Sequence, residues 1–135
     1  MQAIEFGTDG TIGVVSRADP PLPAGHVRVA VAASGLCHTD IAVLRGDYGT
    51  GALPLIPGHE FTGIVTEAAP DVTDPAPGTR VVIDPNLPCG ACRACLRGDG
   101  NLCPDLRAYG VTSDGGFAHQ AIVAAAHALD RKSVV

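Results

Sequence analysis

The segment His26-Val-Arg-Val-Ala-Val-Ala-Ala33 alternates between two kinds of side chain. Val27, Val29 and Val31 fall on one face of an extended chain, and the residues between them fall on the other. β-Branched residues at a spacing of two are typical of a strand with one face buried in a core. We therefore expect a strand over residues 26–33.

Shorter apolar runs on both sides of this strand, bounded by glycine, proline or aspartate, predict a mainly β fold. We expect strands at residues 3–6 and 11–16, which would form a hairpin, and at residues 61–67, 80–84 and 116–124. One short helix is expected at residues 39–45, with Thr39 or Asp40 as its N-cap and Gly46 after its end.

The composition agrees with many short segments joined by turns. The chain has 135 residues, of which 46% are hydrophobic, and it contains 17 glycines and 11 prolines. This length suits one domain, and the share of turn residues disfavours a helix bundle. We expect a partly open, barrel-like β domain with short helical pieces.

The charge balance excludes one class of partner. Lys and Arg number nine against 14 Asp and Glu, which gives a net charge of −5 at pH 7. A protein that binds the phosphate backbone of nucleic acid needs the opposite balance, so we expect no nucleic-acid partner. No apolar run approaches the roughly 20 residues of a transmembrane helix, and the first residues lack the pattern of a signal peptide. We expect no membrane partner and a cytoplasmic location.

Four of the five cysteines fall in one short stretch with the spacing C-x2-C-x2-C-x7-C, namely Cys89, Cys92, Cys95 and Cys103. One loop with this spacing can place four thiolates around a single Zn²⁺, which accepts a tetrahedral site and would have no open position. In a cytoplasmic chain, clustered cysteines indicate metal ligands rather than disulfides. We therefore predict a structural zinc site.

Two other interpretations of this stretch stay open. An iron–sulfur cluster also takes four cysteines, and Pro104 follows the last of them here as in the ferredoxin run, although that run places its last cysteine closer. Buried thiols without a ligand are the plainest alternative. Their clustering within so few residues disfavours that interpretation.

The fifth cysteine, Cys37, lies apart from this stretch. A single cysteine after a strand is more often a small hydrophobic residue than a ligand. Together with His59 and Glu60 it offers sulfur, nitrogen and oxygen donors, which suit a zinc ion with three protein ligands and a free fourth position. The spacing of these residues neither supports nor forbids their meeting in space.

Several motifs occur in a fixed order along the chain: Gly35-Leu-Cys37-His-Thr39-Asp40, Pro57-Gly-His59-Glu60-Phe-Thr-Gly63, Pro77-Gly-Thr-Arg80-Val-Val, and then the cysteine stretch. In this order they resemble the zinc-dependent medium-chain alcohol dehydrogenase family. The resemblance reaches to about Leu129 and covers the N-terminal catalytic domain, a GroES-like, partly open β-barrel. Residues 84–89 and 110–117 are most similar to the polyol (sorbitol-type) and threonine dehydrogenase branches.

The resemblance implies a role for each matching residue. Cys37 and His59 would bind a catalytic zinc ion, and Glu60 would be a third ligand in the polyol-type branch. Thr39 would pass the proton of the substrate hydroxyl towards solvent, and Asp40 would orient His59. The four clustered cysteines would hold a structural zinc. The catalytic zinc would act as a Lewis acid while a small alcohol or polyol loses hydride to NAD or NADP.

The resemblance also implies that residues 1–129 are an incomplete part of a longer enzyme. No G-x-G-x-x-G turn of a dinucleotide-binding domain occurs, so we expect this chain alone to be inactive and the full-length enzyme to be a homo-oligomer. Residues 130–135 differ from the family's continuation and match the translation of a sequencing adapter, so we expect a non-native tail. The alternative function is a non-catalytic, structural zinc-binding module.

Overall fold

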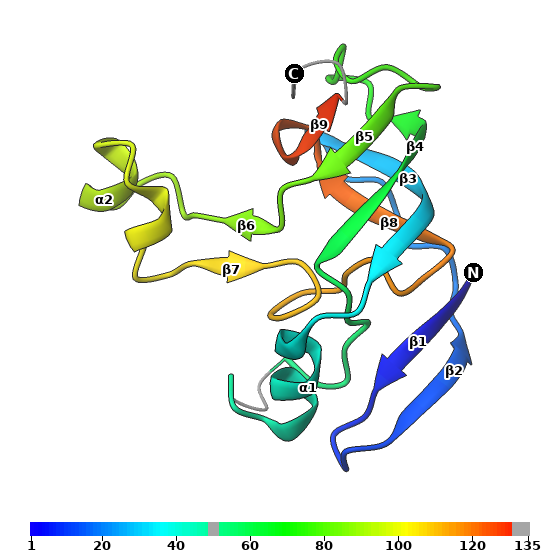
Figure 1. Ribbon diagram of the computed structural model, residues 1–135. Coiled ribbons are helices and arrows are strands. Elements are labelled where there is room, and N and C mark those ends of the chain that lie inside the picture. Colours follow the sequence, from blue (N-terminus) through cyan, green and yellow to red (C-terminus); the bar gives the residue numbers. More distant parts are fainter. Residues whose placement is uncertain (49–51, 131–135) are drawn as a thin grey trace.

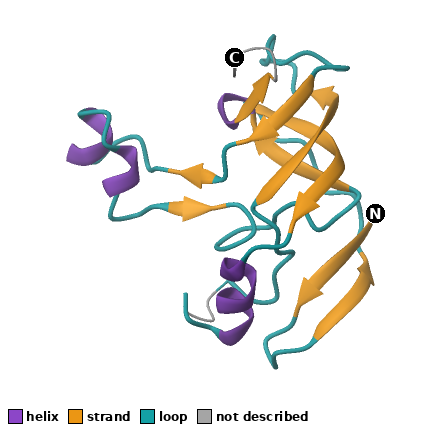
Figure 2. Cartoon of the chain, viewed as in Figure 1, coloured by secondary structure: helices purple, strands orange, loops and turns teal. Residues whose placement is uncertain are grey.

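The structure, a computed structural model, describes residues 1–48 and 52–130 (Figure 1). Its elements in chain order are β1 (Gln2–Phe6), β2 (Ile12–Ser16), β3 (His26–Gly35), α1 (His38–Arg45), β4 (Glu60–Ala68), β5 (Arg80–Ile83), β6 (Asn86–Leu87), α2 (Arg93–Leu96), the 3-10 helix η1 (Gly100–Leu102), β7 (Arg107–Ala108), β8 (Gln120–Ala124), the 3-10 helix η2 (Ala125–His127) and β9 (Ala128–Asp130). Strands predominate over helices (Figure 2), which confirms the predicted mainly β class.

The central feature is a five-stranded antiparallel sheet in the order β8-β3-β4-β5-β9. Its two edge strands, β8 and β9, are joined by η2 alone. Four strand spacings of about 4.8 Å would hold the edges of a flat sheet about 19 Å apart. The four Cα steps from Ala124 to Ala128 reach at most about 14 Å, so the sheet must curl. The result is a partly open barrel (Figure 1).

The long strand β3 lies inside this sheet and pairs with β4 on one side and β8 on the other. Its predicted alternation is confirmed over residues 26–30, where Val27 and Val29 are fully buried and their neighbours are more exposed, whereas Val31, predicted on the same face, is only partly buried. The register with β4 shifts at two places, after Arg28 and after Val31. Such bulges bend a strand and increase its twist, which helps the sheet to close around its core.

The core of the barrel consists of residues that alternate inward along the five strands, together with one tyrosine: Val27, Val29, Phe61, Val65, Val81, Ile83, Tyr109, Ala121, Val123 and Ala128. Two smaller units are attached to this barrel. The predicted hairpin is confirmed as β1 and β2, which pair in antiparallel register. The second unit is an arm in which β6 and β7 pair and lead to α2, away from the barrel (Figure 1).

Several details differ from the sequence predictions. The strand expected at residues 116–124 covers only Gln120–Ala124, and the short strands β6 and β7 were not predicted. The N-cap of α1 is Cys37, not Thr39 or Asp40, because the Asp40 side chain reaches back to the N–H of Cys37. The last strand, β9, was not predicted; its residues pair with β5. Asp130 ends β9, and the remainder of the expected tail, residues 131–135, lies outside the described residues. Within the described part of the chain, no helix is long and apolar enough to cross a membrane.

Val81 and Val82 on β5 lie on opposite faces of the sheet. Truncating each of them tests which face contributes more to the free energy of unfolding. Val81 is fully buried and Val82 is 43% exposed. We expect Val81→Ala to lower the free energy of unfolding by about 2 kcal/mol, since two methyl groups leave a close-packed core. Val82→Ala should cost clearly less. Urea denaturation of both variants with bound zinc measures the difference, and equal losses would contradict the assigned faces.

Candidate metal centres

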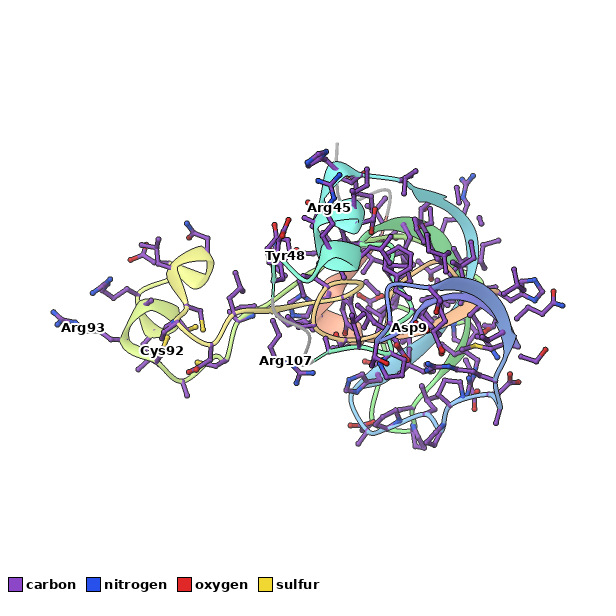
Figure 3. All side chains as sticks on the ribbon, turned by 90° about the horizontal axis from the view of Figure 1, so that it is seen from below. Asp9, Arg45, Tyr48, Cys92, Arg93 and Arg107 are labelled. Atoms are coloured by element: carbon purple, nitrogen blue, oxygen red, sulfur yellow. The ribbon has the colours of Figure 1, made fainter. Side chains whose placement is uncertain are left out.

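The four clustered cysteines form a small lobe at the end of the arm. The pairing of β6 with β7 holds the two ends of residues 88–106 together, so the chain between them must return on itself. Helices α2 and η1 fold within this loop. In Figure 3 the sulfur atoms gather beside Cys92, while Arg93 points away from them into solvent.

The sulfur atoms of the lobe lie at the spacing of a single ion. All four lie within 4.8 Å of one another. The Cys92 and Cys95 sulfurs are 3.4 Å apart, and those of Cys89 and Cys95 are 3.9 Å apart. Four sulfurs at about 2.3 Å from a tetrahedral zinc ion would be about 3.8 Å from one another. The lobe therefore has the dimensions that a four-thiolate zinc site requires.

Backbone amides point at these sulfurs, as expected for groups that carry negative charge. The N–H of Cys92 donates to the Cys89 sulfur at 3.4 Å, the N–H of Cys95 to the Cys92 sulfur at 3.5 Å, and the N–H of Cys89 to the Cys103 sulfur at 3.4 Å. Amides of Ala91 and Cys92 lower the pKa of Cys89 to about 7. Desolvation, with the neighbouring Cys92 thiol, raises the pKa of Cys95 to about 12.

These pKa values predict an order of reactivity in the metal-free chain. The thiolate is the nucleophile, and a lowered pKa makes it the major form of Cys89 above about pH 7. We expect iodoacetamide to modify Cys89 faster than Cys95, with a rate at Cys89 that rises through pH 7 and then levels off. Mass spectrometry of timed peptide digests measures this. Equal rates at Cys89 and Cys95 would contradict the assignment.

The second group of donors lies where β3 ends and β4 begins. Gly35, the last residue of β3, pairs with Glu60, the first residue of β4. Cys37 follows β3 after one residue, and His59 directly precedes β4, so this pairing brings both to one end of the sheet. The ligand atoms of Cys37, His59 and Glu60 lie within 4.8 Å of one another. The strand register thus unites residues that the sequence separates.

A buried carboxylate connects the two halves of this group. Asp40 is 1% exposed. One of its oxygens accepts the N–H of Cys37 at 2.8 Å, and the other accepts the N–H of Gly58 at 3.2 Å. That second oxygen also lies 3.5 Å from Nδ1 of His59. A ligating histidine usually directs its second ring nitrogen at a carboxylate or carbonyl oxygen. Nδ1 of His59 is buried and makes no hydrogen bond within the described part of the chain, and the Asp40 carboxylate lies beside it.

The other imidazole nitrogen of His59, Nε2, is available to bind a metal ion. Nε2 of His59 faces the Glu60 carboxylate, with 4.0 Å between Nε2 and Oε1. The hydroxyl of Thr39 lies 3.7 Å from the Cys37 sulfur. A cavity of about 480 Å³ opens beside His59 and Glu60, and apolar side chains such as Val82 line its other walls. That volume is within the range of small-molecule sites.

A glycine-rich segment packs closely against the turn that carries His59. Gly58 has φ of +90°, and a Cβ there would lie 2.5 Å from the ring of Phe117. A Cβ on Gly110 would lie 2.5 Å from the backbone of Gly58, and Gly115 approaches the same backbone closely. The family resemblance implied a close backbone approach at Gly58 and marked residues 110–117 as similar to the polyol-type branches, but it did not indicate that the two segments meet.

Gly58→Ala tests this close packing, with Gly10→Ala as its matched control. Both glycines have positive φ, +90° and +77°, but no atom lies within 4 Å of the position that a Cβ would take on Gly10. Both variants should bear about 1–3 kcal/mol of backbone strain. The overlap with Phe117 should lower the free energy of unfolding of Gly58→Ala by a further amount of about 1–3 kcal/mol. Urea denaturation measures both, and equal losses would show that the turn has room for a methyl group.

Comparison with known proteins agrees with this arrangement. Residues 23–133 match the family model of the alcohol dehydrogenase GroES-like domain. The chain is 53% identical over 127 residues to D-altritol 5-dehydrogenase of Agrobacterium fabrum (strain C58), covering 94% of this chain and 38% of that protein. The chain thus spans between 25% and 38% of the length of its curated relatives.

Solved structures agree in fold. A protein of Sinorhizobium meliloti 1021 described as a zinc-binding dehydrogenase, bound to NADP, superposes with a TM-score of 0.91 at 40% identity over 96% of this chain and 37% of its own. An alcohol dehydrogenase from E. coli CFT073 in complex with NADH gives a TM-score of 0.89 at 34% identity, over all of this chain and 40% of its own. The predicted GroES-like fold is confirmed, and the chain belongs to the alcohol dehydrogenase GroES-like domain family.

Proposed function

We propose that residues 1–129 form the N-terminal catalytic domain of a zinc-dependent alcohol or polyol dehydrogenase that uses NAD or NADP. The observation that carries this proposal is the convergence of Cys37, His59 and Glu60, whose ligand atoms lie within 4.8 Å of one another beside a cavity. A thiolate, an imidazole and a carboxylate are the donor types of catalytic zinc sites, which leave one position open.

Each residue of the site then has a defined task. Cys37, His59 and Glu60 hold the metal, and Asp40 keeps the His59 ring in the orientation that presents Nε2. Thr39, half-buried and 3.7 Å from the Cys37 sulfur, is placed to accept a hydrogen bond from a substrate hydroxyl and to pass its proton on towards solvent. A zinc ion bound here would supply Lewis-acid activation of the alcohol oxygen.

The four-cysteine lobe has a different role in this proposal. Cys89, Cys92, Cys95 and Cys103 would bind a structural zinc with no open position. Their sulfurs lie at the spacing of one ion, whereas the ligands of an iron–sulfur cluster must surround several metal atoms and their bridging sulfides. This spacing favours zinc over the cluster.

Further parts of the proposal concern the whole protein. The nicotinamide cofactor would bind to the part of the protein that the longer relatives possess beyond this match, and the substrate would be a small alcohol or polyol. We also propose that the whole enzyme is a homo-oligomer of the cytoplasm. All five cysteines are free of disulfides, as expected in a reducing compartment.

One specific observation supports a second candidate function, a non-catalytic zinc-binding module. The four-cysteine lobe has its complete set of ligands within this chain. Metal content separates the two candidates. We expect two zinc ions per wild-type chain, and one in Cys37→Ser and in Cys103→Ser. Inductively coupled plasma mass spectrometry of the dialysed proteins measures this. One zinc in the wild type, unaffected by Cys37→Ser, would favour the module.

A chimera tests the catalytic proposal itself. Residues 1–129 would replace the matching segment of D-altritol 5-dehydrogenase, which is 53% identical over 127 residues. We expect NAD- or NADP-dependent oxidation of D-altritol or a related polyol, retained in His26→Gln and abolished in Cys37→Ser. The change in NADH or NADPH fluorescence on binding verifies that each chimera folds and binds cofactor. A chimera that binds cofactor but oxidises no polyol would contradict the proposal.

A further inference from the structure

A second segment of the chain forms backbone hydrogen bonds with the turn that carries His59. Residues 113–117 lie alongside residues 55–58 and bond to them through the backbone. The N–H groups of Gly115 and Gly116 donate to the carbonyls of Ile56 and Gly58, each at 2.7 Å, and that of Phe117 donates to Pro57 at 2.9 Å. Three consecutive amides of this segment therefore fix the carbonyls that lead to His59.

One side chain of this segment completes the attachment. Oδ1 of Asp114 accepts the N–H of Ile56 at 2.9 Å. Ile56 is 1% exposed, so its amide has no ready replacement from solvent if that acceptor is removed. Oδ2 of Asp114 pairs with Arg17 at 3.3 Å, and Arg17 also pairs with Glu5. This network connects the β1–β2 hairpin to the turn.

The His59 turn thus lies between two carboxylates. Asp40 accepts the N–H of Gly58, and Asp114 accepts the N–H of Ile56, two residues earlier. The Asp40 carboxylate also lies beside the His59 imidazole. Asp114 contacts this turn only through the backbone N–H of Ile56. The direction in which the His59 ring leaves the turn depends on both attachments, because Gly58, which directly precedes His59, has no Cβ to restrict its backbone and is held only by its surroundings.

We propose that Asp114 is a positioning residue for His59, held in its working orientation by Arg17. This inference rests on the proposed function, since it requires that Cys37 and His59 hold a metal ion. The contrasting view is that Asp114, whose side chain is 51% exposed, forms an ordinary surface ion pair with little effect beyond stability. The two views differ in what they predict for metal affinity.

Cobalt loading separates these views within one molecule. Co²⁺ replaces zinc and gives distinct visible absorption at a four-thiolate site and at a site with mixed ligands. The four-cysteine lobe is therefore an internal control for the Cys37–His59 site. The variants are Asp114→Ala, Asp114→Asn, which keeps an oxygen acceptor for Ile56, and Arg17→Gln. The matched control is Glu67→Ala, which removes an ion pair with Arg28 from a carboxylate of similar exposure, 55%.

We expect Asp114→Ala to weaken cobalt binding at the Cys37–His59 site by about tenfold or more, the effect typical of residues that orient a metal ligand. Its d–d bands should shift, and the affinity of the four-cysteine site should not change. Asp114→Asn should restore most of the affinity, and Glu67→Ala should change neither site. Competition with a chelator measures each affinity. Arg17→Gln should weaken the same site less, and it is the deciding variant if Asp114→Ala does not fold.

Two results would overturn the inference, and they are distinguishable. If the wild type binds two cobalt ions and Asp114→Ala binds both with unchanged affinity and spectrum, Asp114 has no positioning role and the proposed function stands. If the wild type binds cobalt only at the four-cysteine site, the proposed function fails and the positioning role fails with it. A loss of affinity at both sites to the same degree would indicate general destabilisation and also contradict the proposal.

Discussion

The candidate catalytic site depends on one buried carboxylate. Asp40 is almost completely removed from water, which costs free energy unless its oxygens are hydrogen-bonded. The N–H groups of Cys37 and Gly58 provide those bonds. The same contacts join the start of α1 to the turn before β4. Because the buried Asp40 carboxylate needs both hydrogen bonds, these bonds fix the position of Cys37 relative to His59. The chemistry proposed for the site follows from that position.

The two metal centres differ in how the chain builds them. The four-cysteine lobe is local: one loop, closed by two short strands, contributes every ligand. The Cys37–His59 site is non-local, because it needs the register of β3 against β4 and the curl of the whole sheet. A closed set of thiolates can stabilise its loop without the barrel. The Cys37–His59 site, which leaves one metal position open, exists only when the barrel has formed. The barrel places this site beside a cavity, which suits it to bind substrate.

Local patterns predicted most of the fold. Alternating valines identified β3, a glycine-bounded pair of runs identified the first hairpin, and cysteine spacing identified the lobe. The sequence failed where the deciding contact is distant. Strand β9 has three residues and no pattern of its own, and it exists because β5 offers an unpaired edge. Only the family resemblance connected Cys37 with His59 in advance, and nothing connected Asp114 with Ile56, 58 residues away.

The central claim is that the fold brings Cys37 and His59 to one metal ion. A crystal structure of the zinc-loaded chain, with anomalous diffraction recorded at the zinc edge, tests this most directly. We expect two anomalous peaks: one among four sulfurs at about 2.3 Å, and a second at bonding distance from the Cys37 sulfur and Nε2 of His59. A well-ordered barrel with full zinc occupancy in the lobe and no peak at Cys37 would contradict it.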